Sequence, residues 1–244
     1  MKAKTGTCDN RRMSRPDISI IIPVLNEAGG IVRALERLLE FRARGAEIIV
    51  VDGGSDDGTA QLALPFADCV TGATRGRGAQ MNFGARKASG DIFLFLHADT
   101  QLPPSAPDLI AAAIAGGACW GRFDVRIDGS SGALALVALM MNWRSRLTGI
   151  ATGDQAIFVT REAFQAVGGF PAIPLMEDIV LSGSLRRIAR PACLREKVTT
   201  SGRRWEQHGL LRTILTMWWL RLRFHFGASP DDLAREYGYA VRKN

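Results

Sequence analysis

Cysteine is scarce in this chain, and long apolar runs are absent from it. The four cysteines, Cys8, Cys69, Cys119 and Cys193, lie far apart and form no Cys-x-x-Cys pair. This spacing does not fit a structural metal site or a disulfide framework, and it favours a reducing compartment. No segment reaches 18 uninterrupted apolar residues, and residues 1–16 lack the apolar core of a secretory signal. We therefore expect a cytoplasmic protein without a membrane-spanning helix.

The formal net charge of +7 is concentrated at the two ends of the chain. Residues 1–16 carry five basic and one acidic side chain, and residues 203–244 carry eight basic and four acidic ones. This distribution argues against a folded nucleic-acid-binding face and favours contact of the ends with a polyanionic surface. No zinc-finger spacing or basic–aromatic RNA-binding motif occurs, so we expect no nucleic-acid partner.

Short apolar runs alternate with helical patterns over most of the chain. The runs 18–24, 47–51 and 92–96 are too short for helices and too apolar for edge strands, which is typical of strands buried in a parallel sheet. An amphipathic helix predicted over 28–44 completes a βαβ unit. A chain of 244 residues with 47% hydrophobic content can build one α/β domain.

Acidic residues follow two of these predicted strands. Asp52 ends the run 47–51 and opens a glycine-rich turn, and Asp99 closes the tripeptide His97-Ala98-Asp99 after the run 92–96. Ligands of open α/β sheets bind at the carboxyl ends of strands. Asp52 is therefore a candidate acceptor for a nucleobase or ribose, and Asp99 a candidate ligand for a divalent cation on a diphosphate. The alternatives are an ordinary capped turn at Asp52 and a helix cap at Asp99.

Charged residues gather at the starts of two predicted helices. Arg75 and Arg77 stand among glycines at the start of a helix, where guanidinium and backbone N–H groups favour an anion. Glu177 and Asp178 lie in the first turn of another helix. The alternatives are a solvated turn for the arginines and simple complementation of the helix dipole for the two acids. No Gly-Lys-Ser/Thr follows the turn at Asp52, which excludes a P-loop there.

Two further helices are strongly apolar. The segment 133–143 is apolar nearly all round, which predicts a core helix or, as the less favoured alternative, one side of an acceptor groove. The segment 209–226 either closes the core or lies on an anionic membrane surface, to which its tryptophans and arginines are suited. We expect peripheral membrane association, through a face that holds Leu211, Ile214, Leu215, Trp218, Leu222 and Phe226.

The chain resembles the inverting, nucleotide-sugar glycosyltransferases of family 2, which have the GT-A fold. Six motifs occur in the family's order over residues 18–205: Ile-Ile-Ile-Pro-Val-Leu-Asn-Glu at 20–27, Val-Asp-Gly-Gly-Ser-Asp-Asp-Gly-Thr at 51–59, Gly-Arg-Gly-Ala at 76–79, Phe-Leu-His-Ala-Asp at 95–99, Glu-Asp at 177–178 and Arg-Arg-Trp at 203–205. Within the family, the chain looks most like a small bacterial branch linked to arsenosugar biosynthesis.

The resemblance implies a fold and a division of the chain. The fold is α/β, a Rossmann-like and mostly parallel nucleotide-binding sheet with helices on both faces. It would occupy residues 17–205, between a disordered basic arm at 1–16 and a C-terminal amphipathic helical segment at 206–244.

The resemblance also implies how a donor is held. Pro23, Asn26 and Glu27 would hold the nucleoside of a nucleotide-sugar, for which a UDP-sugar is favoured, with Asp52 near the base. Arg77 would lie by the nucleotide. Arg203, Arg204 and Trp205 resemble the family's Gln-x-x-Arg-Trp element, although Ser201 stands where that element has glutamine.

The remaining roles concern the metal and the chemistry. Asp99 would bind Mn²⁺ or Mg²⁺ on the diphosphate, and Asp178 would be the general base, with Glu177 beside it. His97 departs from the family, which usually has an acid there. It is a second candidate metal ligand or a direct contact to phosphate.

We expect an acceptor that is either membrane-linked or a small molecule, and two other functions compete with sugar transfer. A nucleotidyltransferase also builds a metal–nucleotide site on an α/β sheet, but the loop 23–27 lacks the basic, glycine-rich segment of that class. A non-catalytic nucleotide- or membrane-binding module is the other alternative.

Overall fold

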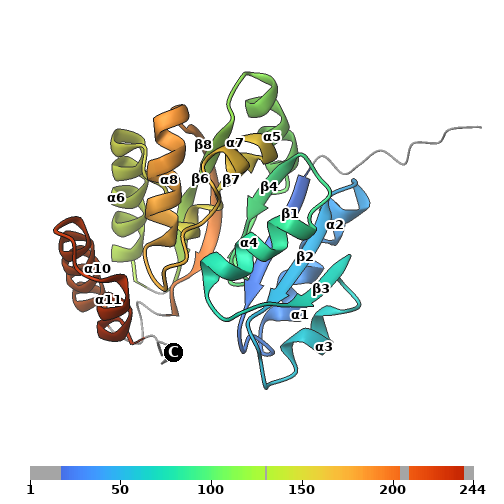
Figure 1. The fold of residues 1–244 in the computed structure, drawn as a ribbon, viewed down its shortest axis with the longest axis horizontal. Coiled ribbons are helices and arrows are strands. Elements are labelled where there is room, and N and C mark those ends of the chain that lie inside the picture. Colours follow the sequence, from blue (N-terminus) through green and yellow to red (C-terminus); the bar gives the residue numbers. More distant parts are fainter. Residues whose placement is uncertain (1–17, 130, 204–208, 239–244) are drawn as a thin grey trace, which may run out of the picture.

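A computed structural model describes residues 18–129, 131–203 and 209–238 (Figure 1). Eight strands among these residues form one sheet in the order β3-β2-β1-β4-β7-β6-β8-β5. The first four are mutually parallel, and they are β1 (Ile18–Val24), β2 (Glu47–Asp52), β3 (Cys69–Gly72) and β4 (Ile92–Phe95). The apolar runs of the sequence therefore form the predicted parallel half of the sheet.

The second half of the sheet is mixed. It consists of β5 (Thr100–Gln101), β6 (Trp120–Asp128), β7 (Phe158–Thr160) and β8 (Ala192–Ser201). β7 is antiparallel to both β4 and β6, whereas β6 and β8 are parallel and β5 is antiparallel to β8. Antiparallel pairing places the amino end of β7 beside the carboxyl end of β4, so segments far apart in sequence meet at one edge of the sheet.

Helices cover both faces of the sheet, as predicted. One face packs against α1 (Ile31–Glu36), α2 (Leu39–Ala43), α3 (Thr59–Ala63), α5 (Ala106–Ala115) and α6 (Ala133–Thr148). The other packs against α4 (Arg77–Lys87), α7 (Arg161–Ala166) and α8 (Glu177–Ile188). Alternate residues of each central strand enter the two cores; Ile20 and Ile22 face one, and Ile21 faces the other.

The predicted helix over 28–44 is wrong in its extent. The chain forms a turn before Ile31, and a second break at Arg37 and Leu38 separates α1 from α2. The break changes which side chains reach the core. Leu38 and Phe41 are buried, whereas Leu39, which the single helix would have placed inside, is 39% exposed.

The segment at 133–143 is not the simple core helix that the sequence favoured. It belongs to α6, which buries Leu134, Val137 and Ala138 against the sheet. Its outer side leaves large apolar side chains in contact with solvent, namely Leu136, Leu139, Met140, Trp143 and Leu147. A helix whose buried and exposed faces are both apolar shows no hydrophobic periodicity, because its two faces do not differ in polarity. The sequence pattern therefore does not reveal which face is exposed.

The last two helices, α10 (Leu210–His225) and α11 (Pro230–Glu236), pack on each other and on the segment before α8. In Figure 1 they lie below α6, away from the parallel half of the sheet. Leu220 and Leu233 are fully buried at their contact. None of the described helices combines the length and apolar content needed to cross a bilayer. The division of the chain at residues 16/17 and 205/206 stays a prediction, and both points lie outside the described residues.

Candidate active site

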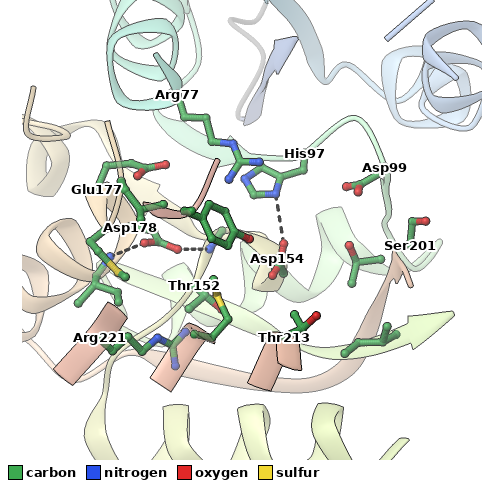
Figure 2. A pocket seen from close by; sticks show the side chains of 18 residues that line it. Arg77, His97, Asp99, Thr152, Asp154, Glu177, Asp178, Ser201, Thr213 and Arg221 are labelled. Carbon is green, nitrogen blue, oxygen red and sulfur yellow. Dashed lines mark hydrogen bonds and ion pairs between the residues drawn. The ribbon is translucent and has the colours of Figure 1, made fainter. Parts of the chain in front are cut away.

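A polar pocket lies past the carboxyl end of β4 (Figure 2). The structure brings five predicted site residues together in its wall and adds Asp154, a residue that the sequence did not single out. These six side chains, all ionisable, are Arg77, His97, Asp99, Asp154, Glu177 and Asp178. They come from α4, the loop after β4, the short 3₁₀ helix η1 (Gly153–Gln155) and the start of α8.

His97 faces the acidic side chain of η1. Its Nδ1 lies 3.4 Å from Oδ1 of Asp154 (Figure 2). Gly153 makes this approach possible, since a Cβ there would lie 2.5 Å from Cε1 of the imidazole. The antiparallel pairing of β4 with β7 is the cause, because it sets the residues just before β7 against those just after β4.

Asp178 is held in place by two backbone groups. Its Oδ2 accepts a hydrogen bond of 2.8 Å from the N–H of Gly153, and its Oδ1 accepts one of 2.8 Å from the N–H of Ile179. Met176, just before the helix, has the left-handed φ of 71°, which is rare for a side chain of this kind. Such strained positions gather at functional sites, where surrounding contacts enforce them.

Glu177 is buried next to Asp178. Only 5% of the residue is exposed, and burial, together with the neighbouring Asp178 charge, raises the pKa of its carboxyl to about 7; the guanidinium of Arg77 acts in the opposite direction. Gly78 lets α4 approach the segment before α8 closely, because a Cβ at this position would lie 2.9 Å from the carbonyl oxygen of Pro171. Two adjacent acids therefore have different environments, the usual basis for different roles.

The predicted nucleoside-binding residues surround the ends of β1 and β2, outside the lining of this pocket. Asp52 is 8% exposed; its carboxylate accepts hydrogen bonds from the N–H groups of Gly54 and Ser55 and from the Ser55 hydroxyl. A carboxylate has about four acceptor positions, so this loop leaves room for one further donor. Asn26 lies opposite, where its Oδ1 accepts from the N–H of Asp56.

Glu27 connects this loop with the pocket. Its carboxyl is half-buried, and burial and the Asp99 charge raise its pKa, whereas the charges of Arg203 and Arg77 lower it. Pro23 is in β1, paired with Val51. Arg203 also donates from Nε to the Ser201 hydroxyl at 3.2 Å. The predicted partners Arg204 and Trp205 lie outside the described residues.

The residues present fit a divalent cation only as part of a nucleotide complex. No three His, Cys, Asp or Glu side chains come together as a metal cage in the described part of the chain. A nucleotide-bound Mg²⁺ needs only one or two protein carboxylates, since phosphate and water oxygens complete its shell. Asp99 is exposed and meets this requirement. The His97 ring lies against Gly153 and Asp154, so its role as a metal ligand stays a prediction.

Sequence reasoning missed Asp154 and Arg221. Asp154 stands in what reads as an ordinary turn, and Arg221 is one of several arginines in an amphipathic helix. Both line the pocket (Figure 2), together with Thr152 and Thr213. No spacing rule connects η1 with α10, so tertiary packing alone reveals that these side chains meet.

Comparison with known proteins identifies the family. The model of the family "Glycosyl transferase family 2" matches residues 19–158, more than half of the chain. This chain belongs to glycosyltransferase family 2. An uncharacterized glycosyltransferase of Mycobacterium tuberculosis is 38% identical over 106 residues, which are 41% of this chain and 40% of that protein. The undecaprenyl-phosphate 4-deoxy-4-formamido-L-arabinose transferase of Pseudomonas fluorescens is 33% identical over 108 residues, 39% of this chain and 32% of that protein.

Solved structures confirm the predicted GT-A fold for this family 2 member. Glucosyl-3-phosphoglycerate synthase from Mycobacterium tuberculosis, solved with Mn²⁺, UDP and glucosyl-3-phosphoglycerate, superposes with a TM-score of 0.56 at 20% identity. The match covers 76% of this chain and 71% of that one. The curated relatives are matched over less than half of their own lengths. The more specific resemblance to the arsenosugar branch stays a prediction.

The raised pKa of Glu177 predicts a pH-dependent stability. Between about pH 4.5 and 7 the folded protein holds this proton while the unfolded chain releases it, so the free energy of unfolding falls as the pH rises through this window. The loss amounts to about 3 kcal/mol for the shift from 4.5 to about 7. In urea denaturation, the stability of Glu177→Gln relative to wild type should therefore be higher at pH 8 than at pH 5.

Glu162→Gln is the matched control, because it removes an exposed carboxylate from the first turn of the neighbouring helix α7. An equal difference between Glu177→Gln and wild type at both pH values would contradict the assignment of a buried, neutral carboxyl.

Proposed function

We propose that this protein transfers a sugar from a nucleotide diphosphate donor, with a UDP-sugar favoured, to an acceptor hydroxyl with inversion at the anomeric carbon. The observation that carries the proposal is the placement of Asp178. Its carboxylate is fixed by the N–H groups of Gly153 and Ile179 in a pocket that also contains Asp99 and Arg77. A general base and the groups that bind a leaving diphosphate thus face one cavity.

The donor would extend from the ends of β1 and β2 into the pocket. Asp52, Pro23, Asn26 and Glu27 would hold the nucleoside, and Arg77 the diphosphate, aided by Arg203, Arg204 and Trp205. Mn²⁺ or Mg²⁺ bound with the donor would neutralise charge on the leaving diphosphate, and Asp99 would be its protein ligand. The likeness to a fold solved with UDP and Mn²⁺ supports a nucleotide donor bound together with a divalent cation.

Asp178 would take the proton of the acceptor hydroxyl as the new glycosidic bond forms. Its two backbone hydrogen bonds fix the carboxylate orientation and favour the charged form that a base needs. Glu177 would carry its proton near neutral pH and so avoid placing a second buried negative charge beside the base. A single base, without an assigned nucleophile for a covalent intermediate, corresponds to inversion.

We also propose that the protein associates peripherally with anionic membranes through an apolar face on α6 and α10. Five side chains of α10 and its C-cap are more than half exposed, an unusual arrangement for a water-facing helix: Leu215, Trp218, Trp219, Leu222 and, at the C-cap, Phe226. Tryptophan and arginine suit the bilayer interface, and the basic residues of 1–16 would add about 1 kcal/mol each near an anionic surface. The named activity of the Pseudomonas relative on undecaprenyl phosphate, a lipid, is consistent with a membrane location.

Asp178→Asn should reduce kcat for sugar transfer by about 10²- to 10⁴-fold, the usual contribution of general base catalysis. Release of nucleoside diphosphate from a panel of nucleotide-sugars and acceptors measures transfer, and calorimetry should show nearly unchanged donor binding. Asp108→Asn, at an exposed position on α5, is the control. Retained turnover in Asp178→Asn together with its loss in Glu177→Gln would exchange the two roles.

Asp99→Asn should weaken Mn²⁺-dependent donor binding by at least about tenfold, because even residues that only orient metal ligands contribute 10- to 100-fold. Calorimetric titration of nucleotide-sugars with and without Mn²⁺ measures this effect independently of turnover. Asp91→Asn, at the amino end of the same strand, is the matched control. Equal donor affinity in EDTA and in Mn²⁺ would remove the cation from the proposal.

The purified protein should pellet with phosphatidylglycerol vesicles at low salt, less at high salt, and weakly with phosphatidylcholine vesicles. Leu215→Glu should lower the partition coefficient about tenfold, since burying a leucine contributes about 1.5–3 kcal/mol. Leu64→Glu changes a similarly exposed leucine at the end of α3, which lies far from α10 in Figure 1, and should have no effect. Protein that stays in the supernatant at low salt would contradict the membrane proposal.

A further inference from the structure

An apolar groove lies between α6 and α10, beside the active-site pocket. It has a volume of about 640 Å³, which is the size of a site for a small organic ligand. Met140 and Trp143 line it from α6, and Ile214, Met217 and Trp218 from α10. Some of its lining residues, such as Leu139, Leu147 and Trp218, are also exposed, so the groove belongs to the face proposed to meet the membrane.

Two arginines interrupt the apolar lining. Arg144 projects into it from α6 and Arg221 from α10. Nε and Nη2 of Arg144 are buried and have no hydrogen-bond partner in the described structure. Burial and the nearby Arg221 charge lower the pKa of Arg144 to about 10. Buried, unpaired donors on Arg144 beside the second positive charge of Arg221 are costly, and an anion bound between the two arginines would remove that cost.

The groove is continuous with the site of the proposed chemistry. Asp154, Met217 and Arg221 line both cavities, and in Figure 2 Arg221 lies below Asp178. The negative charge of Asp178 also acts on Arg144. From the surface inward, the order is therefore an apolar channel, a pair of cations and the proposed base.

We propose that the groove binds the acceptor, and that the acceptor is a glycerophospholipid whose anionic phosphodiester carries a hydroxylated head group, as in phosphatidylglycerol. One chain would fill the apolar channel, the phosphodiester would bind Arg144 and Arg221, and a head-group hydroxyl beyond it would reach Asp178. The ligand's order of chain, anion and hydroxyl matches the order of the groove. The inference rests on the proposed function and adds the acceptor class to it.

The transfer step balances without a further reactant. The head-group oxygen forms a bond to the anomeric carbon of the donor as the bond from that carbon to the diphosphate oxygen breaks. The bonding electrons leave with the nucleoside diphosphate, and the hydroxyl proton moves to Asp178. The phosphodiester takes no part in bond making, which agrees with its place on two arginines between the apolar channel and the proposed base.

Three ligands of matched chemistry test the binding. Calorimetric titration below the micelle concentration should give lauroyl-lysophosphatidylglycerol a Kd at least about tenfold lower than monolauroylglycerol, which lacks the phosphate, and glycerophosphoglycerol, which lacks the chain. Equal affinity for the phosphate-free lipid would show that the groove recognises only the chain. Equal affinity for the chain-free anion would show that it recognises only the phosphate. Either result overturns the proposal.

Variants of the two arginines locate the phosphate. Arg144→Gln and Arg221→Gln should each weaken lysophosphatidylglycerol binding about tenfold and leave monolauroylglycerol binding unchanged. Arg212→Gln is the control, because Arg212 is an exposed arginine of α10 outside the groove lining. Arg221→Gln tests the assignment by itself if Arg144→Gln fails to fold. Identical effects of Arg212→Gln and Arg221→Gln would show bulk charge attraction and overturn the assignment.

Nucleoside diphosphate release with a panel of nucleotide-sugars separates the two proposals. Lysophosphatidylglycerol should stimulate release by wild type, and Asp178→Asn should bind this lipid but show no stimulation. Transfer to another acceptor without stimulation by the lipid overturns the acceptor class and leaves the proposed function intact. Binding of the lipid without donor binding or any transfer overturns the proposed function, and the acceptor assignment with it.

Discussion

The parallel pairing of β1 with β2 on one side and β4 on the other is the constraint on which the site depends. It brings the loops after these strands to one edge of the sheet, at the point where the strand order reverses. Buried Gln80 stabilises this edge, because its amide donates to the carbonyl oxygens of Val24 and Val51, at 2.9 and 2.8 Å. The ends of β1 and β2 are thereby held at a fixed separation by one side chain of α4.

The antiparallel strand β7 supplies the other wall of the site. Its direction brings η1 against His97, and η1 in turn donates the N–H of Gly153 to Asp178. The wall carries structural costs, since Glu177 is buried with a raised pKa and Met176 has a left-handed backbone. Buried ionisable groups with shifted pKa values and strained backbone positions are both typical of functional sites.

The site and the apolar face of α6 and α10 meet at one wall. Met217 and Arg221 of α10 line the pocket and the groove alike, so the helix proposed to contact lipid also forms part of the candidate active site. The small core around Leu220 and Leu233 anchors α10 to α11 and to the segment before Glu177. A ligand seated between α6 and α10 would thus lie next to the pocket that contains Asp178, the proposed base.

The sequence alone determined the buried strands, their parallel arrangement and the motifs at their carboxyl ends. Apolar runs such as 18–24 and 47–51 have one stable place, the middle of a sheet, and Asp52 and Asp99 follow from where those runs stop. The extent of the helix after β1 was mispredicted, because a break at Arg37 leaves the apolar pattern almost unchanged. Tertiary structure alone decided the pairing of His97 with Asp154, the contact of Gly153 with Asp178, and the groove that holds Arg144 and Arg221. These depend on strand direction and helix packing between segments up to about 80 residues apart, and local periodicity carries no information about either.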